Sequence, residues 1–295
     1  MSATPDDRSM PAPPPDDVQI RLEGVRYQYA GTRAWALDGI DLDVRRGEVV
    51  GVVGANDSGK STVCLVASAL APAVTGGRLE GRVWLVAGET HGLPPHEAAR
   101  LCGVLFQNPL AQLSGTAATV WEEIAFGPRN LGLGPGRIAE HVERSLQLLR
   151  IGHLAPREPG RLSGGQAQLV ALASVLALGP KALVLDEPTS QLDPEGTRLV
   201  GEAIRRIATE TGSGVLVVEH KTALLAAISD RVVVLDGGRT IAAGATAEIL
   251  ADERLAAVGF DAPPAVRLRR AAAGAGLAPA VAERLAGAVA AETGG

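Results

Sequence analysis

The sequence is poor in cysteine and carries no excess of basic residues. Its 295 residues include two cysteines, Cys64 and Cys102, which are too few for a disulfide framework and lack the spacing of metal ligands. We expect both to be buried thiols in a reducing cytoplasm. Lys and Arg number 28 against 33 Asp and Glu, which gives a formal net charge of −5. This balance argues against a general nucleic-acid-binding protein, which usually carries a basic excess.

Apolar runs long enough to span a membrane are also missing. No uninterrupted apolar stretch approaches the ~18–20 residues that cross a bilayer. Residues 1–17, MSATPDDRSMPAPPPDD, are acidic and proline-rich, unlike a secretion signal, which begins with basic and then apolar residues. Too few of them are apolar to offset the entropy lost on ordering, so we expect a disordered leader. No internal repeat is visible, so we expect one copy of each functional motif.

The rest of the chain has the composition of a folded protein, with 46% hydrophobic and 21% charged residues. Residues 18–53 predict short strands, and the last run, VVGVVG, is apolar on both faces like a central parallel strand. Further on, apolar runs alternate with helical patterns, which predicts a parallel sheet covered on both faces. The tail from about Asp252 is predicted to be helical, with a hinge candidate at Pro263–Pro264. Between residue 53 and this tail we expect a strand near 81–87, a mostly helical region at 94–154, a helix at 162–178, a strand at 182–186, a helix at about 194–209, a strand at 215–219, a helix from 222 and a strand at 231–238.

The loop after the buried strand has the pattern of a phosphate-binding loop. Residues 54–61 read GANDSGKS and fit G-x-x-x-x-G-K-[ST] between a strand and a helix. The backbone N–H groups of such a loop and the positive end of the helix dipole hold a polyphosphate. We expect Lys60 to reach the β- and γ-phosphates and the Ser61 hydroxyl to bind Mg²⁺. The predicted phosphate-contacting residues are Gly54, Asn56, Asp57, Ser58, Gly59, Lys60, Ser61 and Thr62.

Two acids end the apolar run at 182–186. Asp186 and Glu187 follow ALVL directly, and charge buried at a strand end usually answers a cation or a reaction because it is costly when unpaired. We expect Asp186 to hold Mg²⁺, directly or through water, and Glu187 to act as general base on the attacking water. Together with the phosphate-binding loop, these acids predict a nucleoside triphosphatase.

A second anion-binding pattern identifies the family. Leu162–Gln166 reads LSGGQ, and a serine with two glycines ahead of a helix offers a hydroxyl, N–H groups and a helix dipole to an anion. A second such site is redundant for one nucleotide unless it serves the ATP of a partner. The segment resembles the signature of ABC ATPases, in which two cassettes pack head to tail and each ATP lies between one phosphate-binding loop and the other LSGGQ. In that arrangement the residues facing the partner's ATP are Ser163, Gly164, Gly165 and Gln166.

The resemblance covers about residues 18–244 and carries further roles. It implies a RecA-like P-loop α/β fold with an antiparallel β subdomain, a helical signature subdomain at about 108–178, a cassette spanning 18–250 and a helical extension at 251–295. Tyr29, with Tyr27 as competitor, resembles the aromatic residue that stacks on adenine. Gln107 resembles the glutamine that joins the Mg²⁺ and water site to the membrane-facing surface. Asp193 resembles the aspartate that crosses the dimer interface, and His220 resembles the switch histidine that contacts the γ-phosphate.

A narrower match lies between 106 and 133. FQNP at 106–109, Gln112, WEEIAFGP at 121–128 and NLGL at 130–133 look like the corresponding region of energy-coupling factor importers of vitamins, cobalt or nickel. That resemblance implies a second ATPase subunit, identical or paralogous, a membrane coupling subunit and a small membrane substrate-binding subunit. It also implies a peripheral location on the cytoplasmic face of the membrane and no nucleic-acid partner.

Other members of the superfamily stay as alternatives. An ATPase of another ABC importer or exporter would carry the same core motifs. A DNA-repair or chromosome ABC ATPase would have coiled-coil or zinc-bearing insertions, whereas the segment before LSGGQ has neither heptads nor cysteine clusters. A translation-type ABC factor would show two motif sets in one chain.

Two positions depart from the family pattern. Asp57 stands where the loop usually has glycine, so its backbone must adopt the loop's angles and its carboxylate is brought near a polyanion. In one interpretation the Asp57 side chain points to solvent and its backbone N–H still binds the phosphates. In the other, the Asp57 carboxylate weakens ATP binding. Leu169 stands where a basic residue is common, which would remove a phosphate or interface charge. With both Glu187 and His220 present, we expect a hydrolytic site.

Overall fold

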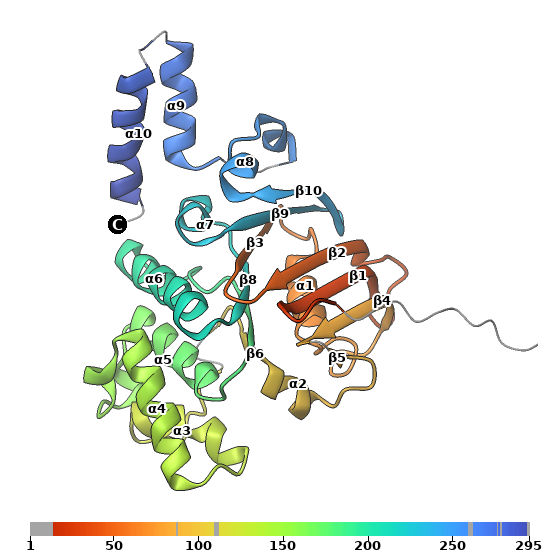
Figure 1. Ribbon diagram of the computed structural model, residues 1–295, viewed down its shortest axis with the longest axis vertical. Coiled ribbons are helices and arrows are strands. Elements are labelled where there is room, and N and C mark those ends of the chain that lie inside the picture. Colours follow the sequence, from red (N-terminus) through yellow and green to blue (C-terminus); the bar gives the residue numbers. More distant parts are fainter. Residues whose placement is uncertain are drawn as a thin grey trace, which may run out of the picture.

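The computed structural model describes residues 14–86, 88–108, 112–258, 262–275, 277 and 279–293, and the leader predicted at 1–17 lies mostly outside them. The described strands form two sheets (Figure 1). The antiparallel sheet has the order β2-β1-β4-β5 and contains β1 (Val18–Gln28), β2 (Leu37–Arg45), β4 (Arg78–Leu85) and β5 (Gly88–Glu89). The larger sheet has the order β10-β9-β3-β8-β7-β6 and contains β3 (Val49–Gly54), β6 (Cys102–Leu105), β7 (Ala182–Asp186), β8 (Gly214–Val218), β9 (Arg231–Asp236) and β10 (Arg239–Ala245).

The larger sheet is parallel except at one edge. β3 pairs in parallel with β8 and β9, β7 pairs in parallel with β6 and β8, and β10 returns as a hairpin antiparallel to β9. Alternate residues of β3 enter different cores, because side chains of a strand point to opposite faces. Val50 and Val52 belong to the core shared with the antiparallel sheet. Val49 and Val53 belong to the core shared with the helical layer, which includes residues 120–211 of the helices that follow β6 and β7. The predicted α/β fold is thus confirmed.

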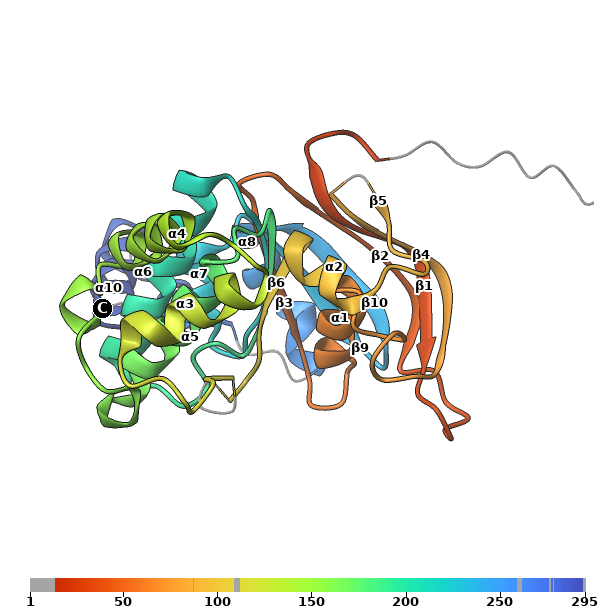
Figure 2. The ribbon, with the colours of Figure 1, turned by 90° about the horizontal axis from the view of Figure 1, so that it is seen from below.

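Helices cover both faces of this sheet. α1 lies between the two sheets, while α3, α4 and α5 lie together at the end of the molecule away from the antiparallel sheet (Figures 1 and 2). α9 and α10 pack against each other and extend beyond the body at the top of Figure 1, whereas α3 and α4 lie at its bottom. The helices are α1 (Lys60–Ala67), α2 (Pro95–Leu101), α3 (Val120–Asn130), α4 (Pro135–Leu149), α5 (Gly164–Leu176), α6 (Pro194–Thr211), α7 (Thr222–Ile228), α8 (Thr246–Leu250), α9 (Pro264–Gly274) and α10 (Pro279–Thr293), with 3₁₀ turns at Gly152–Leu154, Pro159–Arg161 and Glu253–Val258.

One strand was missed within the region predicted to be mostly helical. β6 occupies the edge of the sheet beside β7, and a four-residue apolar run cannot be told from a helix by periodicity. Its Gly103 is required by packing, because a Cβ there would lie 2.3 Å from Val175 Cγ1 of α5. β6 therefore brings the residues that follow it to the carboxyl edge of the sheet.

The two thiols are buried and free, as predicted. Burial raises the pKa of both, and that of Cys102 to about 12, so neither is a reactive thiolate. Within the described part of the chain, no helix has the length and apolar character needed to cross a membrane.

Candidate functional site

A cleft of about 660 Å³ opens where α1 begins. Four parts of the chain line it: the segment after β1 with Tyr29 and Trp35, the loop and helix start at 56–62, the pair Glu187 and His220, and the turn between β9 and β10. Its volume lies within the ~300–1,000 Å³ of small-molecule sites. The phosphate-binding loop and the acid after β7 therefore share one cleft.

The loop is shaped by two glycines that a side chain would disrupt. A Cβ at Gly54 would lie 2.3 Å from the carbonyl oxygen of Leu235, and one at Gly59 would lie 2.8 Å from that of Ala36. Lys60 Nζ donates to the carbonyl oxygens of Gly54 (3.0 Å) and Ala55 (2.7 Å). The ammonium therefore lies over the loop, where a phosphate could take it from these carbonyls.

Charges around Lys60 oppose the effect of its burial. Burial lowers the pKa of Lys60, while the carboxylates of Glu187, Asp186 and Asp57 raise it. The net pKa of Lys60 is lowered, with burial as the largest cause, and the three carboxylates favour the cationic form that can serve as a counter-ion for a polyphosphate.

Asp186 and Ser61 offer oxygen ligands at the base of the cleft. Burial raises the pKa of Asp186, opposed by a hydrogen bond from the Ser61 hydroxyl. Asp186 Oδ1 is buried and has no hydrogen-bond partner among the described residues, so it has an unused acceptor position. The described residues contain no group of three or more His, Cys, Asp or Glu side chains arranged to hold a metal ion. This small oxygen set fits Mg²⁺, which is held by one or two protein ligands together with water and phosphates.

Two side chains contact the Glu187 carboxylate. Its Oε2 accepts a hydrogen bond from Gln107 Nε2 at 2.7 Å, and its Oε1 lies 2.8 Å from His220 Nε2. The three residues follow β6, β7 and β8, which are neighbours in the sheet, and ligand sites of parallel sheets lie at this carboxyl edge. Glu187 also has a φ of 49°, a costly conformation that concentrates at functional sites.

The LSGGQ segment forms an exposed helix start away from this cleft. Ser163 caps α5: its Oγ accepts from Gln166 N at 3.3 Å while its N–H donates to Gln166 Oε1 at 3.2 Å. Ser163 and Gly164 are exposed and do not line the cleft. The start of α6 lies beside it, since a Cβ at Gly165 would be 3.4 Å from Gly196 Cα.

Comparison with known proteins decides the family. A sequence profile described as "ABC transporter" matches residues 37–190. The energy-coupling factor transporter ATP-binding protein EcfA1 of Symbiobacterium thermophilum is 40% identical over 262 residues, which cover 84% of this chain and 87% of the relative. The chain belongs to the ABC transporter family. It is an ATP-binding subunit of this family and an ATP hydrolase.

Solved structures agree with this ABC assignment. The structure of cbiO1 from Clostridium perfringens, part of the ABC transporter complex cbiONQ, superposes with a TM-score of 0.72 at 30% identity and covers 81% of this chain and 93% of its own. MJ0796, a bacterial ABC transporter cassette solved as a dimer, has a TM-score of 0.65 at 25% identity and covers 77% of this chain and 98% of its own.

The two tyrosines of this ABC cassette have different surroundings. Tyr27 is fully buried, and its hydroxyl donates to the carbonyl oxygen of Gly76 at 2.6 Å. Tyr29 lines the cleft, with its hydroxyl 3.1 Å from Thr62 Oγ1. Of the two candidates for the adenine contact, the structure places Tyr29 in the cleft. Leu169 is buried in the core beside the helical layer, so at this position the ABC cassette has apolar packing and not an interface charge.

Two residues flanking the histidine were not predicted. Glu219 is 1% exposed and accepts hydrogen bonds from Thr189 Oγ1 (2.5 Å) and from His220 N (2.8 Å). Lys221 Nζ donates to the carbonyl oxygens of Thr189 (2.8 Å) and Leu192 (3.3 Å) and to a threonine hydroxyl on α6, that of Thr197 (2.7 Å). These bonds tie the histidine segment to the loop ending at Asp193, which caps α6 through a 2.7 Å bond from Gly196 N. The sequence offered one signal for Glu219, which is an acid at the end of an apolar strand. It offered no signal for Lys221.

Removing the Lys221 ammonium should slow hydrolysis without weakening ATP binding. In Lys221→Met the apolar stem stays, but the hydrogen bonds to the 189–193 loop are lost, so we expect kcat to fall about 10-fold, the effect of ~1.4 kcal/mol. Steady-state phosphate release gives kcat, and calorimetry gives the ATP affinity. Lys221→Arg should recover part of the rate, and an unchanged kcat in Lys221→Met would contradict the role of this bridge.

Asp57 is exposed and has a φ of 62°, so it tolerates the backbone angles of a glycine position. Because Asp57 lines the cleft but is exposed to solvent, we expect its effect on a bound polyphosphate to be small but measurable. Asp57→Asn, which removes charge and keeps a residue suited to this conformation, should tighten ATP binding about 2- to 5-fold at low salt. Titration with a fluorescent ATP analogue measures this, and the difference should shrink at ~1 M salt. Equal affinities at low salt would show that Asp57 does not repel the nucleotide.

Proposed function

We propose that the chain is one of two ATPase subunits that drive an energy-coupling factor importer of a vitamin or a transition-metal ion, at the cytoplasmic face of the membrane. The observation that carries the proposal is the bond between Gln107 and Glu187. Phe106, which directly precedes Gln107 in the chain, is 43% exposed, and Phe126 of α3 is 45% exposed. Both belong to the segment that resembles energy-coupling factor ATPases, so a change at Glu187 can reach an apolar surface available to a membrane subunit.

Binding of ATP begins with the loop before α1. Lys60 exchanges its bonds to Gly54 and Ala55 for the β- and γ-phosphates, while Tyr29 stacks on adenine. Ser61 and Asp186 would hold Mg²⁺, which supplies charge neutralisation between the phosphates when bound. The backbone around Gly54, Asn56–Ser58 and Gly59, with Thr62, completes the contacts to the phosphates.

Hydrolysis then depends on the three side chains at the strand ends. Glu187 accepts the proton of the attacking water as general base. His220 holds one carboxylate oxygen and contacts the γ-phosphate, while Gln107 holds the other oxygen. Because both oxygens are fixed, the carboxylate has one orientation toward the water.

Closure of a pair of cassettes completes the site. Ser163, Gly164, Gly165 and Gln166 of each subunit would grip the γ-phosphate held by the other, and Asp193 would lie at the same interface. Two observations support this: the LSGGQ helix start is exposed, and it does not line the cleft of its own chain. Loss of the γ-phosphate removes these contacts, so ATP and ADP shift the equilibrium between closed and open pairs in opposite directions.

Co-purification tests the importer assignment. A tagged chain expressed from its native locus should bring down a second ATPase subunit, a coupling membrane protein and a small membrane substrate-binding protein. An attached periplasmic receptor would instead assign the chain to a conventional importer. The absence of any membrane protein would contradict the transport role.

A further inference from the structure

We propose that Trp35 forms a second aromatic wall of the cleft and contacts the purine nucleoside of the bound nucleotide. The proposal rests on the nucleotide-binding role proposed for this cleft. Trp35 lines the cleft together with Tyr29 and the phosphate-binding loop. Among the described residues that line it, apolar surface for a base comes from Tyr29, Trp35 and Ala36, since the others are polar, charged or glycine.

The backbone around Trp35 is anchored on two sides. Ala36 N donates to the Tyr27 carbonyl oxygen at 2.7 Å, which ties the segment back to β1. Asp38 N donates to the Gly238 carbonyl oxygen at 2.8 Å, which ties it to the turn between β9 and β10. This turn lines the same cleft. Trp35 therefore has a fixed position between two elements of the cleft.

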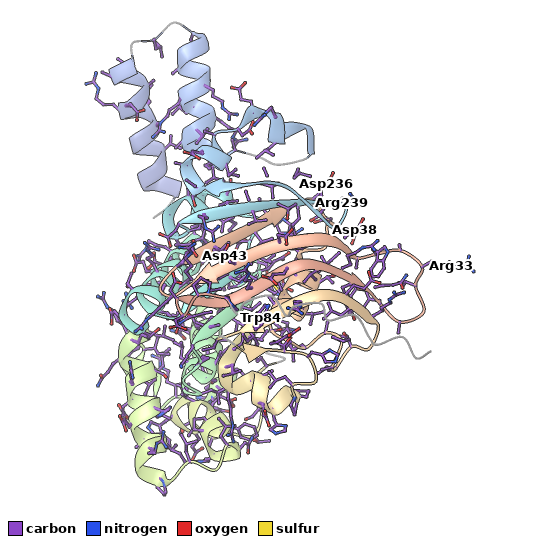
Figure 3. All side chains as sticks on the ribbon, turned by 45° about the vertical axis from the view of Figure 1, so that its right-hand side comes forward. Arg33, Asp38, Asp43, Trp84, Asp236 and Arg239 are labelled. Atoms are coloured by element: carbon purple, nitrogen blue, oxygen red, sulfur yellow. The ribbon has the colours of Figure 1, made fainter. Side chains whose placement is uncertain are left out.

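The indole is also held by a cation. The Arg26 guanidinium lies 4.2 Å from the centroid of the Trp35 ring, a cation–π distance. Arg26 is fixed in turn by Asp38 at 2.7 Å and Glu80 at 3.2 Å. Asp38 also pairs with Arg239, and Figure 3 shows these two residues together where β2 meets the β9–β10 hairpin. Hydrogen bonding to Arg26 is the main cause that lowers the pKa of Asp38, so the supporting carboxylate stays charged.

A ring held in this way can receive a flat base. Two guanidinium groups lie over the indole, that of Arg26 at 4.2 Å and that of Arg78 at 5.8 Å from the ring centroid, and the indole also lines the cleft. Tyr29 is itself fixed, because its ring packs edge-on against Tyr27 at 4.9 Å and its hydroxyl bonds to Thr62. Two prearranged aromatic rings lose little conformational freedom when a nucleoside binds between or against them. The contact depends on the base and sugar and not on the phosphates.

Comparing ATP with inorganic tripolyphosphate isolates this contact. Calorimetry on Trp35→Ala should show an ATP dissociation constant raised about 10-fold, within the range of base stacking on an aromatic residue, and an unchanged affinity for tripolyphosphate. Trp35→Phe should retain most of the affinity for ATP. Trp121→Phe, a control on α3 whose indole bonds to Glu143, should bind both ligands like the wild type.

Tryptophan emission gives a second readout that does not require the alanine variant to fold. ATP should change the emission of the wild type and of Trp121→Phe, and the change should be lost in Trp35→Phe. Unchanged ATP affinity in Trp35→Ala, or equal weakening for ATP and tripolyphosphate, would overturn the proposal for Trp35. Failure of the wild type to bind ATP would instead overturn the proposed function of the cleft.

Discussion

Replacing Glu187 with glutamine should lower the rate of ATP hydrolysis roughly 10²- to 10⁴-fold, the usual contribution of a general base, while ATP still binds. Glutamine has nearly the same shape but cannot accept the proton of the attacking water. Its loss of negative charge also relieves repulsion of the phosphates, because Glu187 lines the nucleotide cleft. We therefore expect an ATP affinity equal to or tighter than that of the wild type.

Phosphate release at saturating ATP measures this effect, with the affinity taken from calorimetry on the same preparation. Glu195→Gln is the matched control, since Glu195 is an exposed acid on α6 that pairs with Arg198 and does not line the cleft. It should hydrolyse ATP at the wild-type rate. Near-normal turnover in Glu187→Gln would remove Glu187 from the general-base role.

Ser163→Asp should abolish most hydrolysis by preventing closure of the pair. Aspartate caps a helix as well as serine does, so α5 keeps its start. The new carboxylate, however, would face the γ-phosphate bound to the partner, and two such charges ~4 Å apart repel by about 4 kcal/mol in a partly desolvated interface. We expect the ATPase rate to fall on the order of 100-fold or more. Binding of ATP to the single chain should not change, since Ser163 does not line its own cleft.

Ser163→Asn separates this electrostatic effect from a loss of capping. Asparagine also caps helices well and has nearly the same size as aspartate, but it carries no charge. We expect it to retain much of the activity, and both variants should melt within a few degrees of each other. Equal ATPase rates for the aspartate and asparagine variants would mean that no phosphate approaches Ser163.

Much of the fold could be predicted because local pattern and tertiary structure agree. The VVGVVG run reads as a central strand and is one, since its alternate valines enter the cores on both faces of the sheet. The helix predicted at 162–178 runs from Gly164 to Leu176, and Ser163 is its capping residue. β6 could not be predicted, because its four residues owe their conformation to pairing with β7.

The site residues that belong to a sequence motif could be predicted, whereas the contacts between motifs could not. Gln107 and His220 were predicted from their resemblance to family motifs, and Glu187 from its place at the end of an apolar strand. That Gln107 and His220 meet at the Glu187 carboxylate follows from the strand order β6-β7-β8. Trp35 and Lys221 left no signal, because their contacts come from residues that are distant in the sequence or that lie in loops. Such contacts are set by tertiary structure alone.

Whether ATP joins two cassettes can be measured as the mass of the Glu187→Gln chain in solution. Light scattering would be carried out on the isolated ATPase subunits with Mg²⁺ and either ATP or ADP. The second subunit is another copy of this chain or a paralogue that co-purifies with it. We predict a pair with ATP, single chains with ADP, and single chains with ATP once Ser163→Asp is added. If bound ATP leaves the mass unchanged, ATP does not join two cassettes. If a pair persists in the Ser163→Asp variant, Ser163 does not face the partner's γ-phosphate.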